Sequence, residues 1–353
     1  MAMEKYLIIN PGSASNKYAL FNEDGQKLST FHFERENSGF VVTISNQKKK
    51  IKKEDYDNAL KYVVNFLKEE IRACAVRIVA PGEYFSEDRL IDKNFINKLE
   101  RQKDSAPLHI GPELEEIKKI KKILPKTKLI AVSDSAFYKN LPEKAKYYGL
   151  PKELEIRRFG YHGISMASIL NKLKKLGKLP KRTIVCHLGS GSSITAVLDG
   201  HAIDTSMGFT PLEGLLMATR PGDIDVGALI YLAKKKKFNF SQLEEYLNTK
   251  CGLLGLSGKT SDIRELLKLE KKGDKDAKLA LEIFVYRIQK YIGSYITALG
   301  GLDLLVFTAT IGERSSIMRG RILKGLKHFG KFDVKIVPTS EGEEMFRQLR
   351  KFL

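Results

Sequence analysis

Two copies of one short pattern constrain the fold of this chain more than any other feature. Each copy is a hydrophobic strand, a Gly-Ser-x-Ser turn and a second strand. Residues 6–21 turn at 12–15, and residues 183–197 turn at 189–192. When the turns are aligned, the apolar positions of the second strands coincide, and an Asp-Gly hairpin signal follows each copy. A repeated supersecondary unit indicates a duplicated domain, with a central cleft between the copies.

The rest of the chain alternates strands with amphipathic helices, which is the pattern of an α/β protein. We predict further strands at residues 27–33, 73–79, 128–132, 304–308 and 334–337, and helices at 55–70, 92–100, 111–124, 224–233, 241–247, 277–299 and from 315. Residues 212–218 predict at most a short helical turn, and 252–258 a glycine-punctuated loop. We therefore predict one domain at 1–150 and a second at 151–339, with a last helix at 340–353 packing back on the first.

Composition narrows the class of protein. A chain of 353 residues is long enough for two domains, and its formal net charge is +19. The lysine clusters lack interleaved aromatic residues, so we interpret them as solvated faces and expect no specific nucleic-acid partner. Three distant cysteines indicate a reducing, cytoplasmic location. No apolar run is long enough for a membrane span, so we expect no membrane association.

The segment at residues 204–225, DTSMGFTPLEGLLMATRPGDID, contains no lysine, and its one cation is Arg220. Its large apolar side chains would not stay together in a solvated loop, so we predict a packed loop that presents Arg220 to a cleft. The planar guanidinium of arginine grips phosphate and carboxylate oxygens in pairs. The alternative is a buried structural connection in which Arg220 pairs with Asp223 or Asp225.

The two Gly-Ser-x-Ser turns suit anion binding, because small residues let backbone N–H groups approach phosphate oxygens. Lys17 follows the first turn and would add a cation. Neither turn is a Walker A loop or a dinucleotide fingerprint, since the required lysine or third glycine is missing. The histidines have no metal-ligand spacing, so we predict no zinc site.

Ten segments in order resemble the acetokinase family, within the superfamily of acetate and sugar kinases, heat-shock proteins and actin. They are INPGSASNKYALF, VRIVAPGEYF, APLHIGPE, VSDSAF, RRFGYHGIS, CHLGSGSS, the 204–225 segment, GLLGLSGKTSDIREL, FTATIGERS and VPTSE. The resemblance spans nearly the whole chain. It implies duplicated actin-like, ribonuclease H-like domains, the second of which binds nucleotide. It also implies reversible, Mg²⁺-dependent phosphoryl transfer from ATP to acetate in a homodimer, with Mn²⁺ as an alternative metal.

The resemblance also implies a role for individual residues. Catalytic roles fall on Arg77, Asp134, His162 and Arg220. The acyl pocket falls on Arg77, Val79, Leu108, His109, Tyr161 and Pro211. Nucleotide contacts fall on Lys17, His187, Leu188, Gly189, Ser190, Gly191, Asp262, Ile263, Arg264, Thr310, Ile311, Gly312, Glu313 and Arg314, and magnesium ligands on Asn10 and Glu341.

Elementary chemistry agrees with these roles. A carboxylate acceptor is already ionised at neutral pH, so it needs relief from charge repulsion rather than a general base. We therefore expect Asp134 to orient an arginine or a metal-bound water.

The chain departs from the family pattern mainly on the nucleotide side. Ser190 and Arg314 stand where asparagines are usual, and Thr310 stands where the family has glycine. A Cβ at Thr310 would crowd the adenosine pocket. The alternatives are therefore a pyrophosphate-dependent enzyme, a kinase for propionate or another short-chain acid, and a non-catalytic nucleotide-binding homologue.

Overall fold

The computed structural model describes residues 4–12, 15–36 and 39–353. The chain divides into two compact units. The N-terminal unit comprises Met1–Lys139, Gly163–Ser168 and Ser340–Leu353, and the C-terminal unit comprises Asn140–His162 and Ile169–Thr339. The domain boundaries expected from the sequence stay a prediction. Ser13 and Ala14 of the first Gly-Ser-x-Ser turn lie outside the described residues.

The sheet of the N-terminal unit runs in the order β5-β4-β3-β2-β1-β6-β8-β7. Its strands are β1 Lys5–Asn10, β2 Ser15–Asn22, β3 Lys27–Glu36, β4 Gly39–Ile44, β5 Gln47–Ile51, β6 Ile71–Ile78, β7 Arg89–Leu90 and β8 Lys128–Ser133. β1 to β5 form an antiparallel meander, whereas β1, β6 and β8 are parallel. β6 and β8 therefore end at the same edge of the sheet.

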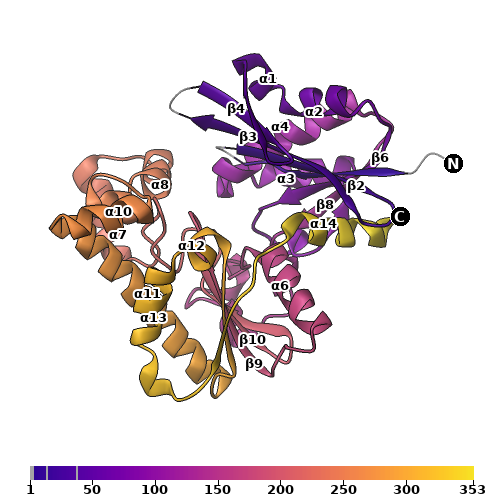
Figure 1. The fold of residues 1–353 in the computed structure, drawn as a ribbon. Helices are drawn as coiled ribbons and strands as arrows, with labels where there is room; N and C mark the ends of the chain where they lie inside the picture. Colours follow the sequence, from indigo (N-terminus) through magenta and orange to yellow (C-terminus); the bar gives the residue numbers. More distant parts are fainter. Residues whose placement is uncertain (1–3, 13–14, 37–38) are drawn as a thin grey trace. The chain divides into compact units, whose positions relative to one another are not determined.

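Helices cover both faces of this sheet (Figure 1). They are α1 Lys53–Asp57, α2 Ala59–Leu67, α3 Lys93–Arg101, α4 Pro107–Ile123 and α14 Glu341–Leu349. Side chains alternate along a strand, so Leu7 and Ile9 join the core under α2, α3 and α4. Tyr6 and Ile8 join the opposite core, which includes Met345 of α14.

The sheet of the C-terminal unit runs in the order β11-β10-β9-β12-β13. Its strands are β9 Arg182–Leu188, β10 Ser192–Leu198, β11 His201–Thr205, β12 Leu304–Thr308 and β13 Asp333–Ile336. The helices are α5 Glu143–Lys146, α6 Gly163–Lys175, α7 Val226–Lys236, α8 Phe240–Thr249, α9 Gly252–Ser257, α10 Ile263–Lys271, α11 Lys275–Leu299, α12 Ala309–Arg314 and α13 Ser316–Lys324. The first six residues of α6 belong to the N-terminal unit. α11 supplies the largest share of the core against β9, β10 and β12.

The two sheets share one topology, which confirms the predicted α/β class and the duplication. In the N-terminal unit the order β3-β2-β1-β6-β8 combines an antiparallel meander with two parallel strands, and β11-β10-β9-β12-β13 repeats it. The repeated strand–turn–strand unit in the sequence is therefore one part of a five-strand repeat that occurs in both sheets.

One local prediction was wrong and one hairpin was missed. α9 replaces the predicted loop at 252–258. The hairpin β4–β5 was not predicted, because the lysines of QKKKI hide its strand pattern. Residues 212–218 form turns and bends, within the short helical turn that was the most their sequence predicted. Tertiary packing overrides weak local propensity in such short segments.

Candidate functional site

Arg77 and Asp134 form a partly buried ion pair in the N-terminal unit. Arg77 lies near the end of β6 and Asp134 directly follows β8, so parallel strands bring them to one sheet edge. Arg77 Nη2 lies 2.9 Å from Asp134 Oδ2, and Asp134 is buried. Burial opposes the charge on Arg77, but the nearby carboxylates of Asp134 and Glu341 outweigh it and raise the pKa of the guanidinium. Arg77 therefore stays charged.

Asn10 and Glu341 meet beside this pair. Asn10 Nδ2 donates to Glu341 Oε2 at 3.4 Å, and Arg77 Nη1 donates to Asn10 Oδ1 at 3.4 Å. Asn10 is the last residue of β1, and Glu341 is the first residue of α14. Lys17 pairs with Asn10 in the β1–β2 register, and its side chain is exposed. The predicted residues from three distant parts of the chain are thus neighbours here.

The residues expected in the acyl pocket begin just after β6. Val79 is buried, and its backbone N–H donates to Glu113 Oε1 of α4 at 2.7 Å. His109 lies in the first turn of the same helix, and the side chain of Leu108 lies outside the described residues. Helix α4 therefore carries both predicted pocket residues and an acid that contacts the strand end.

In the C-terminal unit, His162 is held by two facing residues of the β9–β10 hairpin. His187 and Ser193 are cross-strand partners. The His162 and His187 rings stack with their centroids 4.1 Å apart, and Ser193 Oγ lies 2.9 Å from His162 Nδ1. His162 itself has φ 63°, a left-handed conformation that is uncommon for a residue other than glycine. Ser193 thus fixes the Nδ1 edge of the His162 ring, and Nε2 lies on the opposite edge.

The second Gly-Ser-x-Ser turn meets both His162 and Arg220. A Cβ built on Gly191 would lie 3.4 Å from His162 Nε2 and 3.8 Å from Arg220 Nη1. Ser190 O accepts a hydrogen bond from the N–H of Ala218, which ties the turn to the loop that carries Arg220. Glycine at this point lets the backbone approach an anion held by the two side chains.

The loop at 204–225 is packed, as its apolar residues predicted. Met207, Leu215 and Met217 are fully buried. Arg220 Nη1 donates to Pro211 O at 3.2 Å, and Tyr161 Oη donates to Phe209 O at 2.6 Å, so two predicted acyl-pocket residues lie on or against this loop.

Asp223 and Asp225, the alternative partners for Arg220, make hydrogen bonds to other groups. Asp223 accepts from Gly214 N–H at 2.8 Å and from Tyr291 Oη at 2.7 Å. Asp225 caps α7 by accepting from the Ala228 N–H at 2.7 Å. The two carboxylates therefore accept hydrogen bonds that stabilise the local backbone.

Two further segments carry predicted nucleotide contacts. Asp262 caps α10 and pairs with Arg264, whose side chain is exposed, while Ile263 is buried in the core. In α12, Thr310 and Arg314 are exposed, and Gly312 is buried against β9 and β12. The residue of α12 with a left-handed backbone is Ala309, with φ 63°, and the expected crowding of the adenosine pocket by Thr310 stays a prediction.

The donor set of the N-terminal unit fits magnesium. Mg²⁺ prefers oxygen ligands and usually takes one or two protein carboxylates, with water and substrate phosphates completing its shell. Asn10 Oδ1 and the Glu341 carboxylate are oxygen atoms of this kind and would hold Mg²⁺, while Asp134 binds a different nitrogen of Arg77 from Asn10. Among the described residues, no group of three or more His, Cys, Asp or Glu side chains could hold a metal alone.

Sequence reasoning missed Ser193, Glu113 and Ala309. Ser193 was detectable, because it faces His187 across a predicted hairpin. Glu113 was detectable too, since it shares a helix face with Ile117 and Ile120 and an acid in that pattern is buried. The conformation of Ala309 was not, because alanine normally favours the right-handed helix.

Comparisons with known proteins agree over almost the full length. The model of the Acetokinase family matches residues 5–347. An acetate kinase of Bacillus mycoides is 40% identical, over 94% of this chain and 89% of the relative. Two solved structures superpose well. One is a propionate kinase of Francisella tularensis, with a TM-score of 0.89, 34% identity and coverage of 98% and 99% of the two chains. The other is an acetate kinase of Porphyromonas gingivalis, with a TM-score of 0.85, 32% identity and 99% of both chains covered.

These relatives carry the same two-sheet architecture from end to end, and a match over residues 5–347 includes every predicted site residue. The chain belongs to the Acetokinase family.

Proposed function

We propose that this protein transfers the γ-phosphoryl group of ATP to acetate, giving acetyl phosphate and ADP in a reversible reaction. The observation that carries the proposal is the meeting of His162 Nε2 and Arg220 Nη1 at the Gly191 backbone. A histidine, an arginine and backbone N–H groups around one point are donors suited to a transferring phosphoryl group. The names of the relatives supply the substrate class.

The chemistry needs little proton transfer. A carboxylate oxygen of acetate attacks the γ-phosphorus, the bond between that phosphorus and the β,γ-bridging oxygen breaks, and ADP leaves with the electron pair. Two anions must approach each other, so neutralising charge is the main task. We assign it to Arg220 and His162 on the phosphoryl group, and to Arg77 on the acetate carboxylate.

Asp134 acts through Arg77 in this proposal. It accepts from Arg77 Nη2 and so orients the guanidinium, and it does not take a proton. Asn10 and Glu341 would hold Mg²⁺, which when bound supplies positive charge to the phosphate oxygens. Lys17, the turn at 189–191, and the residues at 262–264 and 310–314 would contact the nucleotide.

The acyl substrate is acetate first and propionate second. Val79, Tyr161 and Pro211 are proposed to contact the methyl group. One methylene in an apolar pocket changes specificity by about 1–3 kcal/mol, so the two acids differ modestly. The Francisella relative, a propionate kinase by name, makes propionate a necessary comparison.

We also propose a cytoplasmic homodimer. The cysteines Cys74, Cys186 and Cys251 are free thiols, which suits a reducing compartment. Helix α7 has no buried residue, and apolar side chains such as Val226, Ile230 and Tyr231 are more than half exposed on it. An apolar helix face of this kind is typical of a protein interface. Among the described residues, none of the helices is both long and apolar enough for a membrane span.

Trapping acetyl phosphate with hydroxylamine tests the function directly. Purified protein is supplied with Mg²⁺, acetate or propionate, and either ATP or pyrophosphate. We expect turnover with ATP and acetate. Turnover with pyrophosphate alone would contradict the ATP assignment, and no turnover by the folded protein with any pair would contradict the proposal.

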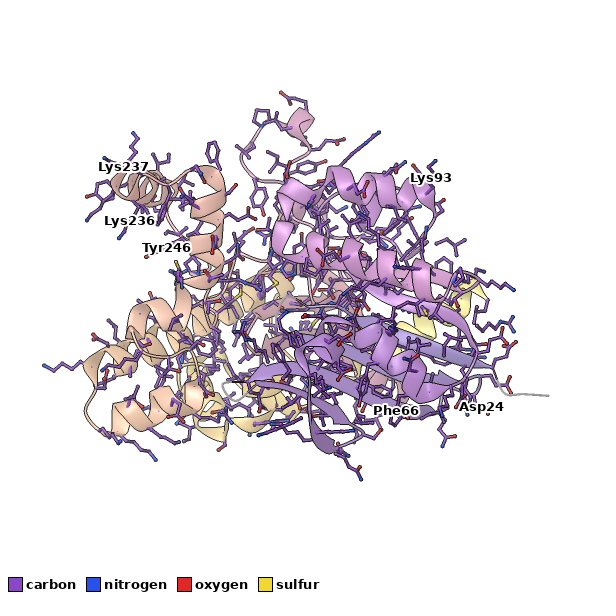
Figure 2. The ribbon with its side chains drawn as sticks, turned by 90° about the horizontal axis from the view of Figure 1, so that it is seen from above. Asp24, Phe66, Lys93, Lys236, Lys237 and Tyr246 are labelled. Carbon is purple, nitrogen blue, oxygen red and sulfur yellow. The ribbon has the colours of Figure 1, made fainter. Side chains whose placement is uncertain are left out.

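Arg220→Ala is the accompanying variant. It should lose at least about 100-fold in kcat, the usual scale for removing one transition-state donor, while circular dichroism stays unchanged. Lys236→Ala is the matched control, because it removes one cation from the exposed end of α7, where Figure 2 labels this side chain. A folded Arg220→Ala protein with near wild-type turnover would remove Arg220 from the mechanism.

A further inference from the structure

Glu113 is a buried acid that the proposed mechanism does not use. It lies on α4, is 2% exposed, and has two carboxyl oxygens with different surroundings. Oε1 accepts the backbone N–H of Val79 at 2.7 Å. Oε2 is buried and has no hydrogen-bond partner among the residues that the structure describes, and the same is true of Arg77 Nε.

We propose that Glu113 is a positioning residue for the acyl substrate. From α4 it fixes the strand end after β6, and it thereby sets the places of the Val79 side chain and of the Arg77 guanidinium. The inference rests on the proposed function, because Val79 and Arg77 are assigned to the acyl substrate there.

The position of Glu113 supports this role. Val79 directly follows β6, and Arg77 is two residues earlier, so one hydrogen bond at Val79 restrains the segment that carries both side chains. The first turn of the same helix contains Leu108 and His109, which are also proposed for the acyl pocket. A single side chain therefore connects two segments that must keep a fixed spacing around a small substrate.

The surroundings of Glu113 indicate what its carboxyl group contributes. Burial raises the pKa of Glu113 well above its usual value, although the Val79 N–H and Arg77 oppose the rise, and Asp134 adds to it. Burial thus favours the neutral carboxyl group, which still accepts the Val79 N–H through Oε1, as the amide oxygen of a glutamine would. The contribution to the strand end is therefore the hydrogen bond to Val79 rather than a negative charge.

Kinetics of four variants test the proposal. Glu113→Leu removes the acceptor for the Val79 N–H. Glu113→Asp shortens the side chain that carries this acceptor, and Glu113→Gln keeps an oxygen at the position of Oε1. The matched control is Glu116→Leu, because Glu116 is also a buried acid on α4, but its Oε1 accepts from Tyr18 Oη at 2.8 Å instead of from the strand end. KM for acetate, KM for ATP, kcat and Tm are measured for each, with propionate as the second acid.

We expect Glu113→Leu to raise KM for acetate about 10- to 100-fold, the scale of a small misplacement, and to leave KM for ATP within about twofold. The preference for acetate over propionate should fall with it. Glu113→Asp should shift KM for acetate in the same direction, and Glu113→Gln should recover most of the loss, because its amide oxygen can accept the Val79 N–H. Glu116→Leu should lower Tm and leave KM for acetate unchanged.

Three results would overturn the inference. The first is a wild-type KM for acetate in Glu113→Leu or, if that variant does not fold, in Glu113→Asp. The second is an equal rise in both KM values, which indicates general loosening. The third is the same KM change in Glu116→Leu. A wild-type protein that is folded but inactive towards acetate would instead refute the proposed function, and the inference with it.

Discussion

Asp88 shows how a single carboxyl can become sensitive to pH near neutrality. Its Oδ1 accepts the N–H of Ser133, the residue before Asp134, at 2.8 Å. It lines a cavity of about 310 Å³ together with Glu344 and Lys351. Burial raises the pKa of Asp88 to about 6, against the opposing effects of the Ser133 N–H and Lys351. This acid therefore contacts the end of β8 next to Asp134, the residue proposed to orient Arg77.

Because the pKa of Asp88 is higher in the folded protein than in the unfolded chain, the folded state binds the extra proton between about pH 4 and 6. Its contribution to stability is present at low pH and is lost as the pH rises towards 6. Asp88→Asn keeps an acceptor for Ser133 without the charge, so it should be more stable than wild type at pH 8 by on the order of 2 kcal/mol, and equal near pH 4. Urea unfolding at both pH values measures this difference.

Asp88→Ala is the comparison for this experiment. It lacks the acceptor for the Ser133 N–H, so it should be less stable than Asp88→Asn at every pH. A difference between wild type and Asp88→Asn that does not change with pH would show that Asp88 does not titrate in this range.

At the residue scale, the sequence predicted the charged groups of the site better than their partners. Arg77, Asp134 and Arg220 stand in motifs whose residue types point to phosphate chemistry. Residues that hold the neighbouring groups, such as Glu113 at Val79 and Ser193 at His162, come from other elements. Contacts between distant elements depend on packing geometry that local patterns do not contain. The motif position of Ile263 predicts a nucleotide contact, which stays a prediction; the fold buries its side chain in the core, so such a contact would come from its backbone.

At the scale of elements, α12 departs most from what its sequence favours. Ala309, its first residue, has a left-handed backbone that costs an L-residue about 1–2 kcal/mol. Its N–H donates to Glu313 Oε1 at 3.0 Å, which closes the first turn. Its Cβ lies 3.6 Å from the position that a Cβ on Gly189 would take, so the start of α12 packs on the proposed phosphate turn.

Ala309→Gly should therefore raise the free energy of unfolding by about 1 kcal/mol, because glycine adopts the left-handed backbone without strain. It should also lower KM for ATP, because removing the Cβ opens the backbone beside Gly189. Thr310→Gly is the matched variant. Its side chain is exposed, so removing it should cost only helix propensity, about 1 kcal/mol or less, and leave KM for ATP unchanged. Steady-state kinetics with varied ATP distinguish them. A decrease in KM for Thr310→Gly alone would show that Thr310, rather than Ala309, crowds the nucleotide site.

Long periodic elements were predictable, and short ones were not. α11 has apolar residues spaced by three or four over its length, and its predicted range of 277–299 lies within Lys275–Leu299. The β4–β5 hairpin places exposed lysines on an edge strand, a pattern that protects edges from pairing with other chains but removes the alternation by which strands are recognised. α9 is only Gly252–Ser257, too short for a helical period to appear.

At the scale of the whole molecule, the net positive charge opposes association of two copies, whereas the exposed apolar face of α7 favours it. Each chain carries a formal net charge of +19, and α7 ends in lysines, with Lys236 and Lys237 labelled in Figure 2. Two copies that meet through the apolar side chains of α7 must overcome this repulsion. Added salt screens charges over about 8 Å at physiological ionic strength, so it should strengthen such a contact.

Light scattering after size exclusion should give wild-type protein twice the 39.9 kDa chain mass, with a dissociation constant that falls as salt rises. Ile230→Glu places a charge at the centre of the exposed face of α7 and should yield monomers, because burying an unpaired carboxylate outweighs one lost apolar contact. Leu176→Glu is the control, since Leu176 is also an exposed apolar residue but lies after α6. A monomeric wild type would contradict the proposed dimer. Monomers from Leu176→Glu alone would show that the interface does not lie on α7. Weaker association at higher salt would instead mean that ion pairs, rather than apolar side chains, hold the two copies together.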